Sequence, residues 1–169
     1  NGAAIQAPIK ILNCNAGFKG RKGTLYEGGI RVPFIVNQPG MVPIQTLDNL
    51  IYFPDMMPTL AALAKGTKHL PKQINGINIL PLFYGKQVDT DNRLLYWEFP
   101  GKQRAARKGD WKCVTIHPNQ PLELYNLKED PEETNNLAKK YPRRVKEFDE
   151  EMQRMHIPTP NWPQPGEQF

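Results

Sequence analysis

The sequence has few of the residues from which metal sites and redox centres are usually built. It contains only two cysteines, Cys14 and Cys113, so at most one disulfide can form, and neither belongs to a Cys-x-x-Cys pair. Each is interpreted as a small buried or half-buried side chain rather than a redox centre. The three histidines, His69, His117 and His156, lack the spacing of a zinc site or a catalytic triad. These absences exclude a disulfide framework and a sequence-local zinc site.

Long apolar runs are also missing. No stretch approaches the roughly 20 apolar residues of a membrane-spanning helix, and no charged-then-apolar leader opens the chain. Residues 1–4 look instead like a cut within a larger protein. No helix-turn-helix, zinc-finger or aromatic RNA-reading motif accompanies the cations. We therefore expect no membrane and no nucleic-acid partner, whereas the net charge of +5 suits an anionic small substrate.

The most informative segment is the loop of residues 19–33. It carries four cations and one carboxylate, namely Lys19, Arg21, Lys22, Arg31 and Glu27. Its glycines allow the backbone to approach a ligand closely, and the apolar run after it predicts a buried strand from Val32 to Asn37. One interpretation is that one or two cations converge on a phosphate or sulfate. The alternative is a solvated basic turn.

The rest of the chain divides into a helical part and a strand-rich part. Asp55 is expected to cap a helix that runs to about Ala64, with Met56, Leu60 and Leu63 on its apolar face. Beyond residue 93, turn signals at regular intervals predict a small antiparallel sheet. The expected strands span residues 94–99, 103–107, 111–117 and 122–125.

The C-terminal part is predicted to be helical. Residues 130–133, Asp-Pro-Glu-Glu, have the order of a capping box, so a short helix is expected to begin there. Apolar residues then recur at spacings of four and three, which predicts an amphipathic helix covering one face of the sheet. These residues are Tyr141, Val145, Phe148, Met152 and Met155. Residues 157–169, with four prolines, are expected to form an extended tail.

The order of residues 22–33 resembles the Gly-Lys-x-x-x-x-Glu-Gly-Gly-x-Arg-x-Pro segment of type I sulfatases, in the alkaline phosphatase superfamily. Four further segments resemble sulfatase elements in the family's order, at residues 53–64, 76–82, 95–112 and 124–138. The resemblance implies an α/β protein, α+β within this segment. Residues 1–92 would form the end of the large sulfatase domain. Residues 93–169 would form a small C-terminal subdomain of about four antiparallel strands packed by a helix, with its tail.

In that family a formylglycine hydrate, made from a Cys/Ser-x-Pro-x-Arg motif, attacks the sulfate ester. This motif is absent here, so the resemblance implies the C-terminal part of a sulfatase, inactive alone, whose partner is the missing N-terminal domain. Such a part could self-associate through an exposed apolar patch. The complete enzyme would hydrolyse a sulfate ester of a glycan or an aryl alcohol, as arylsulfatases do, in a secreted, periplasmic or lysosomal setting. The alternatives are a phosphodiesterase or phosphonate monoester hydrolase of the same superfamily, or a non-catalytic interaction module.

The resemblance also assigns site residues. Lys22 matches the family lysine that contacts the sulfate group, so it is the expected catalytic and substrate-binding residue. Asn1 resembles the asparagine of the family's Asp-Asn-Gly motif, which binds Ca²⁺ in the complete enzyme. With the other ligands missing, this chain should bind no calcium there. The alternative for Asn1 is an ordinary frayed terminus.

Two further groups of residues are expected near the site. Glu27, Gly28, Gly29 and Arg31 would support the loop structurally. The second group, Lys102, Gln103 and Arg104, lies where family members often place substrate contacts. Its cations would suit a sulfated sugar with a second anionic group. A solvated hairpin is the alternative for this second group.

Overall fold

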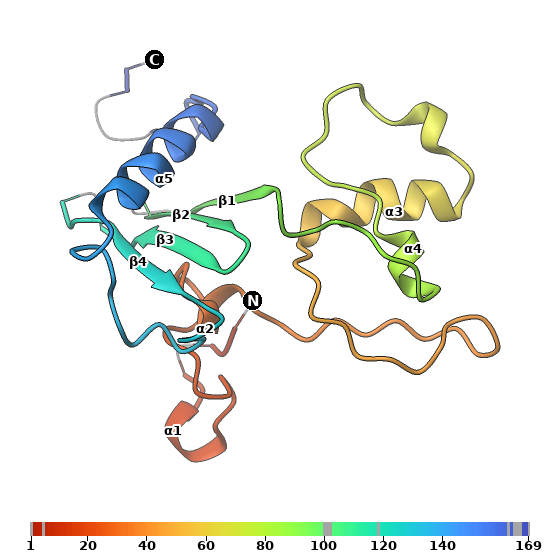
Figure 1. The fold of residues 1–169 in the computed structure, drawn as a ribbon, viewed down its shortest axis with the longest axis horizontal. Coiled ribbons are helices and arrows are strands. Elements are labelled where there is room, and N and C mark those ends of the chain that lie inside the picture. The colour runs from red at the N-terminus through yellow and green to blue at the C-terminus, as the bar shows by residue number, and fades with distance from the viewer. Residues whose placement is uncertain are drawn as a thin grey trace. The chain divides into compact units, whose positions relative to one another are not determined.

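The computed structural model describes residues 2–4, 6–99, 103–117, 119–161, 163 and 167–168. Backbone contacts divide the chain into two compact units, residues 1–33 with 94–169, and residues 34–93. Residues 1–33 thus pack with the C-terminal sheet in this chain (Figure 1). The predicted assignment of residues 1–92 to a large domain and 93–169 to a subdomain concerns the complete protein and stays a prediction.

The first unit is built on a four-stranded antiparallel sheet with the strand order β1-β2-β3-β4. The strands are β1 (Leu94–Phe99), β2 (Gln103–Lys108), β3 (Trp111–Thr115) and β4 (Glu123–Asn126). Each pairs with the next in sequence, so every connection within the sheet is a hairpin. The predicted fold class, a small antiparallel sheet packed by a helix, is therefore confirmed.

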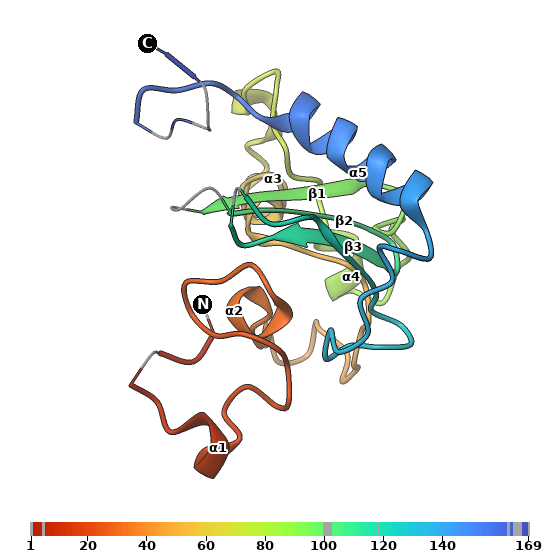
Figure 2. The same ribbon diagram turned by 90° about the vertical axis from the view of Figure 1, so that its left-hand side faces the viewer.

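The two faces of this sheet are covered by different parts of the chain. On one face, Ala105, Val114 and Tyr125 pack against Leu25 and Tyr26 of the N-terminal loop. In this loop region lie the short helices α1 (Ile9–Leu12) and α2 (Glu27–Ile30). Figure 2 shows the sheet edge-on, with α2 below it and α5 above it.

The opposite face carries the second apolar cluster. There Ala106, Cys113 and Leu124 pack against Phe148 and Met152 of α5 (Pro142–Met155). The predicted amphipathic helix is confirmed, and its apolar stripe covers the sheet as expected. Because neighbouring residues of a strand point to opposite faces, this arrangement decides which side chains can reach the N-terminal loop.

The predicted short helix after Asp130 is wrong. The fully described residues 131–140 form turns, and the Asp130 carboxylate accepts hydrogen bonds from the backbone N–H groups of Thr134 at 3.0 Å and Asn135 at 2.8 Å. Glu133 has a φ of 56°, in the left-handed region that a helix cannot continue through. Its carboxylate turns into the protein instead of closing a capping box.

A pH-dependent contact fixes the segment after α5. The ring nitrogens of His156 lie 2.6 Å from Glu98 Oε1 and 2.6 Å from Glu167 Oε1. Burial alone would lower the pKa of His156, but the hydrogen bonds and charges of the two carboxylates raise it above its ordinary value of 6.5. A raised histidine pKa means that the folded state binds the proton more tightly than the unfolded state. The stabilisation is therefore present below pH 6.5 and is lost as the pH rises through the folded-state pKa.

We expect the free energy of unfolding of the wild type to fall between about pH 6 and pH 8, because histidine titrates in this range. In His156→Asn, the part of this fall that comes from His156 should be missing. The measurement is urea unfolding of both proteins at the two pH values. The matched control is His117→Asn, which changes an exposed histidine in the same unit. An equal pH dependence in the wild type and in His156→Asn would contradict the assignment.

The second unit contains η1 (Phe53–Asp55), α3 (Met56–Leu63), η2 (Thr67–His69) and α4 (Leu80–Phe83). The predicted helix is present, but Asp55 does not cap α3 with its side chain. The Asp55 carboxylate is fully buried, accepts N–H hydrogen bonds from Tyr52 and Ile77, both at 2.9 Å, and pairs with Arg93 at 2.6 Å. It therefore joins the start of α3 to segments distant in sequence.

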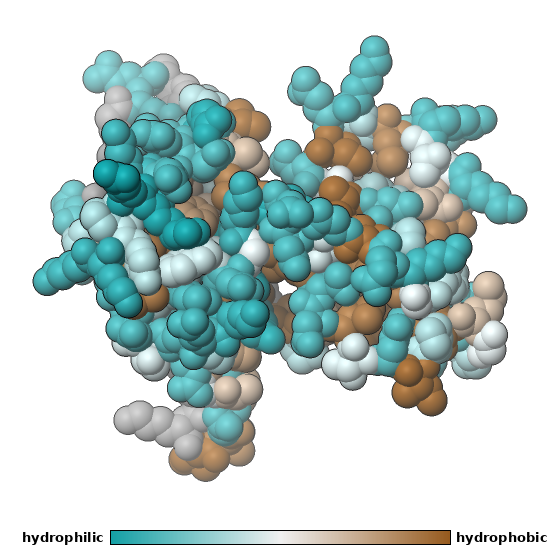
Figure 3. Space-filling view, in the orientation of Figure 1, coloured by the Kyte–Doolittle hydropathy of each residue, from teal (hydrophilic) through white to brown (hydrophobic). Residues whose placement is uncertain are grey.

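The predicted strand from Val32 to Asn37 is wrong for this chain. These residues form no strand pairing in the structure, and Ile35 is 86% exposed. A strand needs a neighbour for its N–H and C=O groups, and the four strands of the described chain pair among themselves. The predicted apolar core face of α3 is also wrong, because Leu60 and Leu63 are more than half exposed whereas Pro58 and Thr59 are buried. Figure 3 shows hydrophobic residues, in brown, among the hydrophilic ones at the surface.

Candidate functional site

The part of the basic loop that precedes α2, residues 18–26, folds closely around this helix. The backbone N–H of Gly28 donates to the Lys19 carbonyl at 2.7 Å. A Cβ on Gly28 would lie only 2.6 Å from that carbonyl oxygen, and a Cβ on Gly29 only 2.0 Å from the Thr24 carbonyl oxygen. Only glycine allows so close an approach of two backbones. Both glycines predicted as loop support are therefore in direct backbone contact with the loop.

Lys22 lies in the exposed part of this loop. Its backbone N–H donates to the Ala3 carbonyl at 3.0 Å, and its side chain is exposed. The Thr24 hydroxyl accepts from the Arg21 N–H at 3.2 Å and donates to the Arg21 carbonyl at 2.9 Å, which closes the turn around Lys22. Lys22 is thus exposed on a turn that is closed by its own hydrogen bonds. Its contact with sulfate stays a prediction.

The start of β2 approaches the same loop. The Gln103 side-chain amide donates to the Gly23 carbonyl at 2.9 Å, directly after Lys22 in the sequence. Arg104 faces the other side of the sheet and pairs with Asp149 of α5 at 3.3 Å. The structure therefore brings Gln103, but not Arg104, to the Lys22 loop, and the substrate role of both stays a prediction.

Two of the predicted site residues, Asn1 and Lys102, lie outside the described residues. Within the described part of the chain, no group of three or more His, Cys, Asp and Glu side chains gathers as a metal site. None of the helices there combines the length and the apolar character that crossing a bilayer requires.

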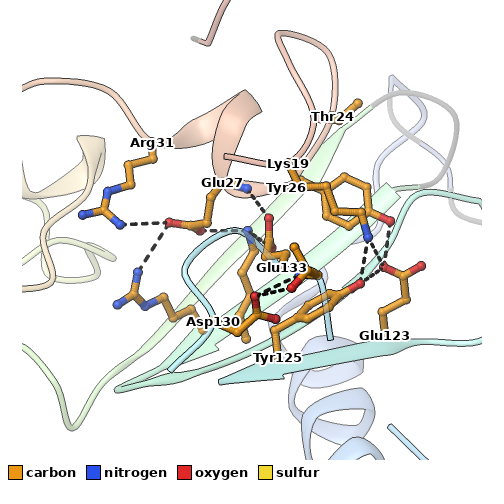
Figure 4. A network of polar contacts seen from close by, with 12 residues as sticks. Lys19, Thr24, Tyr26, Glu27, Arg31, Glu123, Tyr125, Asp130 and Glu133 are labelled. Atoms are coloured by element: carbon orange, nitrogen blue, oxygen red, sulfur yellow. Dashed lines mark hydrogen bonds and ion pairs between the residues drawn. The ribbon is translucent and has the colours of Figure 1, made fainter. Parts of the chain in front are cut away.

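A buried ion cluster lies beneath α2 (Figure 4). Lys112 Nζ is 2.8 Å from Glu27 Oε1 and 2.9 Å from Glu133 Oε1. The backbone N–H of Glu27 donates to Glu133 Oε2 at 2.7 Å. The side chains of Lys112 and Glu133 are both 0% exposed. The cluster therefore ties Glu27, the first residue of α2, to strand β3 and to the turn at Glu133. Removing one partner of such a buried pair is strongly destabilising, because it leaves an uncompensated charge.

Two arginines add positive charge at the edge of this cluster of Lys112, Glu27 and Glu133, called the Lys112 ion cluster below. Arg107 Nη1 lies 3.7 Å and Arg31 Nη1 lies 4.0 Å from Glu27 Oε2. Burial raises the pKa of the Glu133 carboxyl, and the neighbouring Glu27 carboxylate acts in the same direction, whereas Lys112 opposes both. Glu27 and Arg31, predicted as structural support, thus lie in one cluster with residues that the sequence analysis did not single out.

A second polar cluster holds the beginning of the loop. Lys19 Nζ lies 2.8 Å from the Tyr125 hydroxyl and 3.3 Å from Glu123 Oε2. The hydroxyls of Tyr26 and Tyr125 donate to the same Glu123 oxygen at 2.7 and 2.6 Å. Burial alone would raise the pKa of Glu123, but these hydrogen bonds and the Lys19 charge lower it. Lys19 is therefore bound to the sheet, unlike the exposed Lys22.

Comparison with known proteins gives consistent results. The family model described as N-sulphoglucosamine sulphohydrolase, C-terminal, matches residues 18–157. A sulfatase of Formosa agariphila is 30% identical over 168 residues, which cover 84% of this chain and 30% of that protein. An N-acetylgalactosamine-6-O-sulfatase of Bacteroides thetaiotaomicron is 29% identical over 147 residues, which cover 79% of this chain and 29% of that protein.

A solved structure of a sulfatase from Bacteroides thetaiotaomicron, described with the metabolism of multiple glycosaminoglycans, superposes with a TM-score of 0.74 at 27% identity, covering 86% of this chain and 34% of that one. The chain thus spans about a third or less of the length of these relatives. It is similar to their C-terminal portion, which carries the four-stranded sheet and the helix. The chain belongs to the sulfatases, as a member of the N-sulphoglucosamine sulphohydrolase C-terminal family.

Proposed function

We propose that the complete protein hydrolyses a sulfate ester and that Lys22 contacts the sulfate group. The observation that carries this proposal is the Lys22 loop itself, which holds an exposed cation on a turn packed against α2. The ammonium group would offset the negative charge of the ester. It would also stabilise the charge that develops on the leaving oxygen, a contribution that is large when the cation is already in place.

The remaining chemistry would come from outside this chain. A formylglycine nucleophile requires the Cys/Ser-x-Pro-x-Arg motif, which this sequence lacks. Ca²⁺ would add positive charge at the sulfate, with Asn1 as the one ligand contributed here. Within this chain, Gln103 would hold the Gly23 backbone, and the turn of Arg21 and Thr24 would hold the direction of the lysine.

A sulfated carbohydrate is the substrate class that we propose. The relatives include an N-acetylgalactosamine-6-O-sulfatase, and a structure at 25% identity and a TM-score of 0.72 was determined with k-i-k-neocarrahexaose. We further propose a secreted, periplasmic or lysosomal location, where such glycans occur. No nucleic-acid or membrane partner is part of the proposal.

The test is sulfate release by the complete enzyme from sulfated glycosaminoglycan and carrageenan oligosaccharides and from 4-nitrophenyl sulfate. Bis(4-nitrophenyl) phosphate serves as the comparison substrate. Faster turnover of a sulfate ester supports the proposal. Phosphodiester turnover without sulfate release would replace it with the phosphodiesterase alternative, and no turnover of either would favour an interaction module.

We expect the 169-residue chain alone to release no sulfate and to self-associate. It lacks the nucleophile motif, and it exposes Ile35 at 86%, Phe53 at 88% and Leu60 at 58%. Exposed apolar patches favour association, so the sedimentation coefficient should rise with protein concentration. Replacing Ile35 and Phe53 by serine should reduce this rise, whereas Lys68→Ser at another exposed position of the unit should not. A concentration-independent monomer would contradict the expectation.

A further inference from the structure

Lys112 is held by the sheet at a defined place beneath the loop. Strand β3 places it opposite Arg107 of β2 and Tyr125 of β4. Its side chain is 0% exposed and ends between the carboxylates of Glu27 and Glu133. Lys112 therefore has no surface through which it could touch a substrate, and any effect on catalysis must pass through the residues that it contacts.

A continuous set of contacts leads from Lys112 to the Lys22 turn. Lys112 and Glu133 together bind both the side chain and the backbone N–H of Glu27, the first residue of α2. The next two residues, Gly28 and Gly29, are in direct contact with the carbonyl groups of the loop on both sides of Lys22. A shift of Glu27 therefore moves the surface on which the loop is folded.

We propose that Lys112 and Glu133 are positioning residues that set the place of the Lys22 ammonium group. This inference rests on the proposed function of Lys22. In the mostly buried part of the cluster the charges match, with Glu27 and Glu133 against Lys112 and Arg107. Arg31, at 4.0 Å from Glu27, is 52% exposed, so solvent screens its charge. Removing the lysine leaves the carboxylates of Glu27 and Glu133 side by side in a buried place, where they must either move apart or share a proton. Separation moves Glu27, the first residue of α2, and protonation of Glu133 weakens the acceptor that holds the Glu27 N–H.

The expected result of Lys112→Met in the complete enzyme is a loss of about 10- to 100-fold in kcat/KM, because a shift of about 1 Å at a reacting centre costs this much. Lys112→Met added to Lys22→Ala should cause little further loss, since the group that Lys112 positions is then already absent. If Lys112 acts only on stability, the two losses multiply instead, and that result overturns the proposal.

Rescue provides a second readout. The double variant Lys112→Met/Glu133→Gln leaves Glu27 opposite Arg107, so the charges match again, and the glutamine oxygen can still accept from the Glu27 N–H. We expect it to recover at least part of the activity that Lys112→Met loses. A double variant that is less active than Lys112→Met would contradict the charge argument.

Met152→Ala is the matched control, because it destabilises the same sheet from its α5 face without touching the loop. Assayed below its melting temperature, it should keep the wild-type kcat. If it loses as much kcat as Lys112→Met does, the effect is general destabilisation and the proposal fails. If Lys112→Met does not fold, Glu133→Gln alone replaces it, with a several-fold loss expected and the same non-additivity with Lys22→Ala.

Hydrogen–deuterium exchange separates this inference from the proposed function. In Lys112→Met or Glu133→Gln, the amides of residues 20–29 should exchange at least about tenfold faster, while those of α5 keep their protection, because exchange reports local opening. This result supports the positioning role even if Lys22→Ala leaves sulfate release unchanged and the proposed function fails. Unchanged exchange in the loop overturns the positioning role, whatever the activity.

Discussion

Lys22→Ala in the complete enzyme is expected to lower kcat/KM for a sulfate ester by about 100- to 1,000-fold, the usual loss when one preorganised stabilising group is removed from a reaction centre. The reason is electrostatic. The side chain is exposed at a turn closed by Arg21 and Thr24, so alanine removes the charge without creating a cavity. The melting temperature should therefore stay close to that of the wild type.

Lys108→Ala is the control for this experiment, because Lys108 is another exposed lysine of the first unit, at the end of β2. It should leave the kinetics unchanged. Lys22→Arg keeps the charge but places it on a larger, planar group, so we expect an intermediate activity. Unchanged kinetics in Lys22→Ala would show that the loop is a solvated basic turn, the alternative that the composition left open.

Asp55→Ala should give the largest loss of stability. It removes the partner of Arg93 in a buried ion pair, which usually costs about 3–5 kcal/mol in free energy of unfolding. It also leaves the N–H groups of Tyr52 and Ile77 without their hydrogen-bond acceptor. The measurement is urea unfolding of the complete enzyme, followed by hydrogen exchange of residues 50–80 to locate the effect.

Asp48→Ala is the matched control for Asp55→Ala. Asp48 is an exposed aspartate of the same unit, and its replacement should change the free energy of unfolding by about 0.5 kcal/mol or less. A loss in Asp55→Ala that is no larger than in Asp48→Ala would contradict the description of Asp55 as the group that joins three segments of the second unit.

The parts of the fold that depend on local pattern could be predicted from the sequence. The strands of the sheet alternate between two covered faces, and the α5 stripe of Val145, Phe148 and Met152 has the helical period. The strand from Val32 to Asn37 could not be predicted correctly, because its formation depends on a neighbouring strand that the described chain does not offer. The prediction that the apolar side of α3 is buried was wrong for a related reason, since no layer of its own unit covers that side.

Only part of the candidate site could be predicted from the sequence. Residue order identified Lys22, Glu27 and the two glycines beside it. The Lys112 ion cluster was missed because a lysine in a strand normally indicates a solvent-exposed position. Its partners Glu27 and Glu133 lie on the loop and on a later turn, 106 positions apart in the sequence. One signal was present: alternation places Lys112 on the same face of β3 as the buried Val114.

The most direct test of the central claim is a structure of the complete enzyme with a sulfated oligosaccharide bound. The account predicts that Lys22 Nζ lies about 2.7–3.2 Å from a sulfate oxygen, within hydrogen-bond distance. It also predicts that Lys112 stays buried between Glu27 and Glu133 beneath that loop. A bound sulfate with Lys22 pointing into solvent would contradict the account.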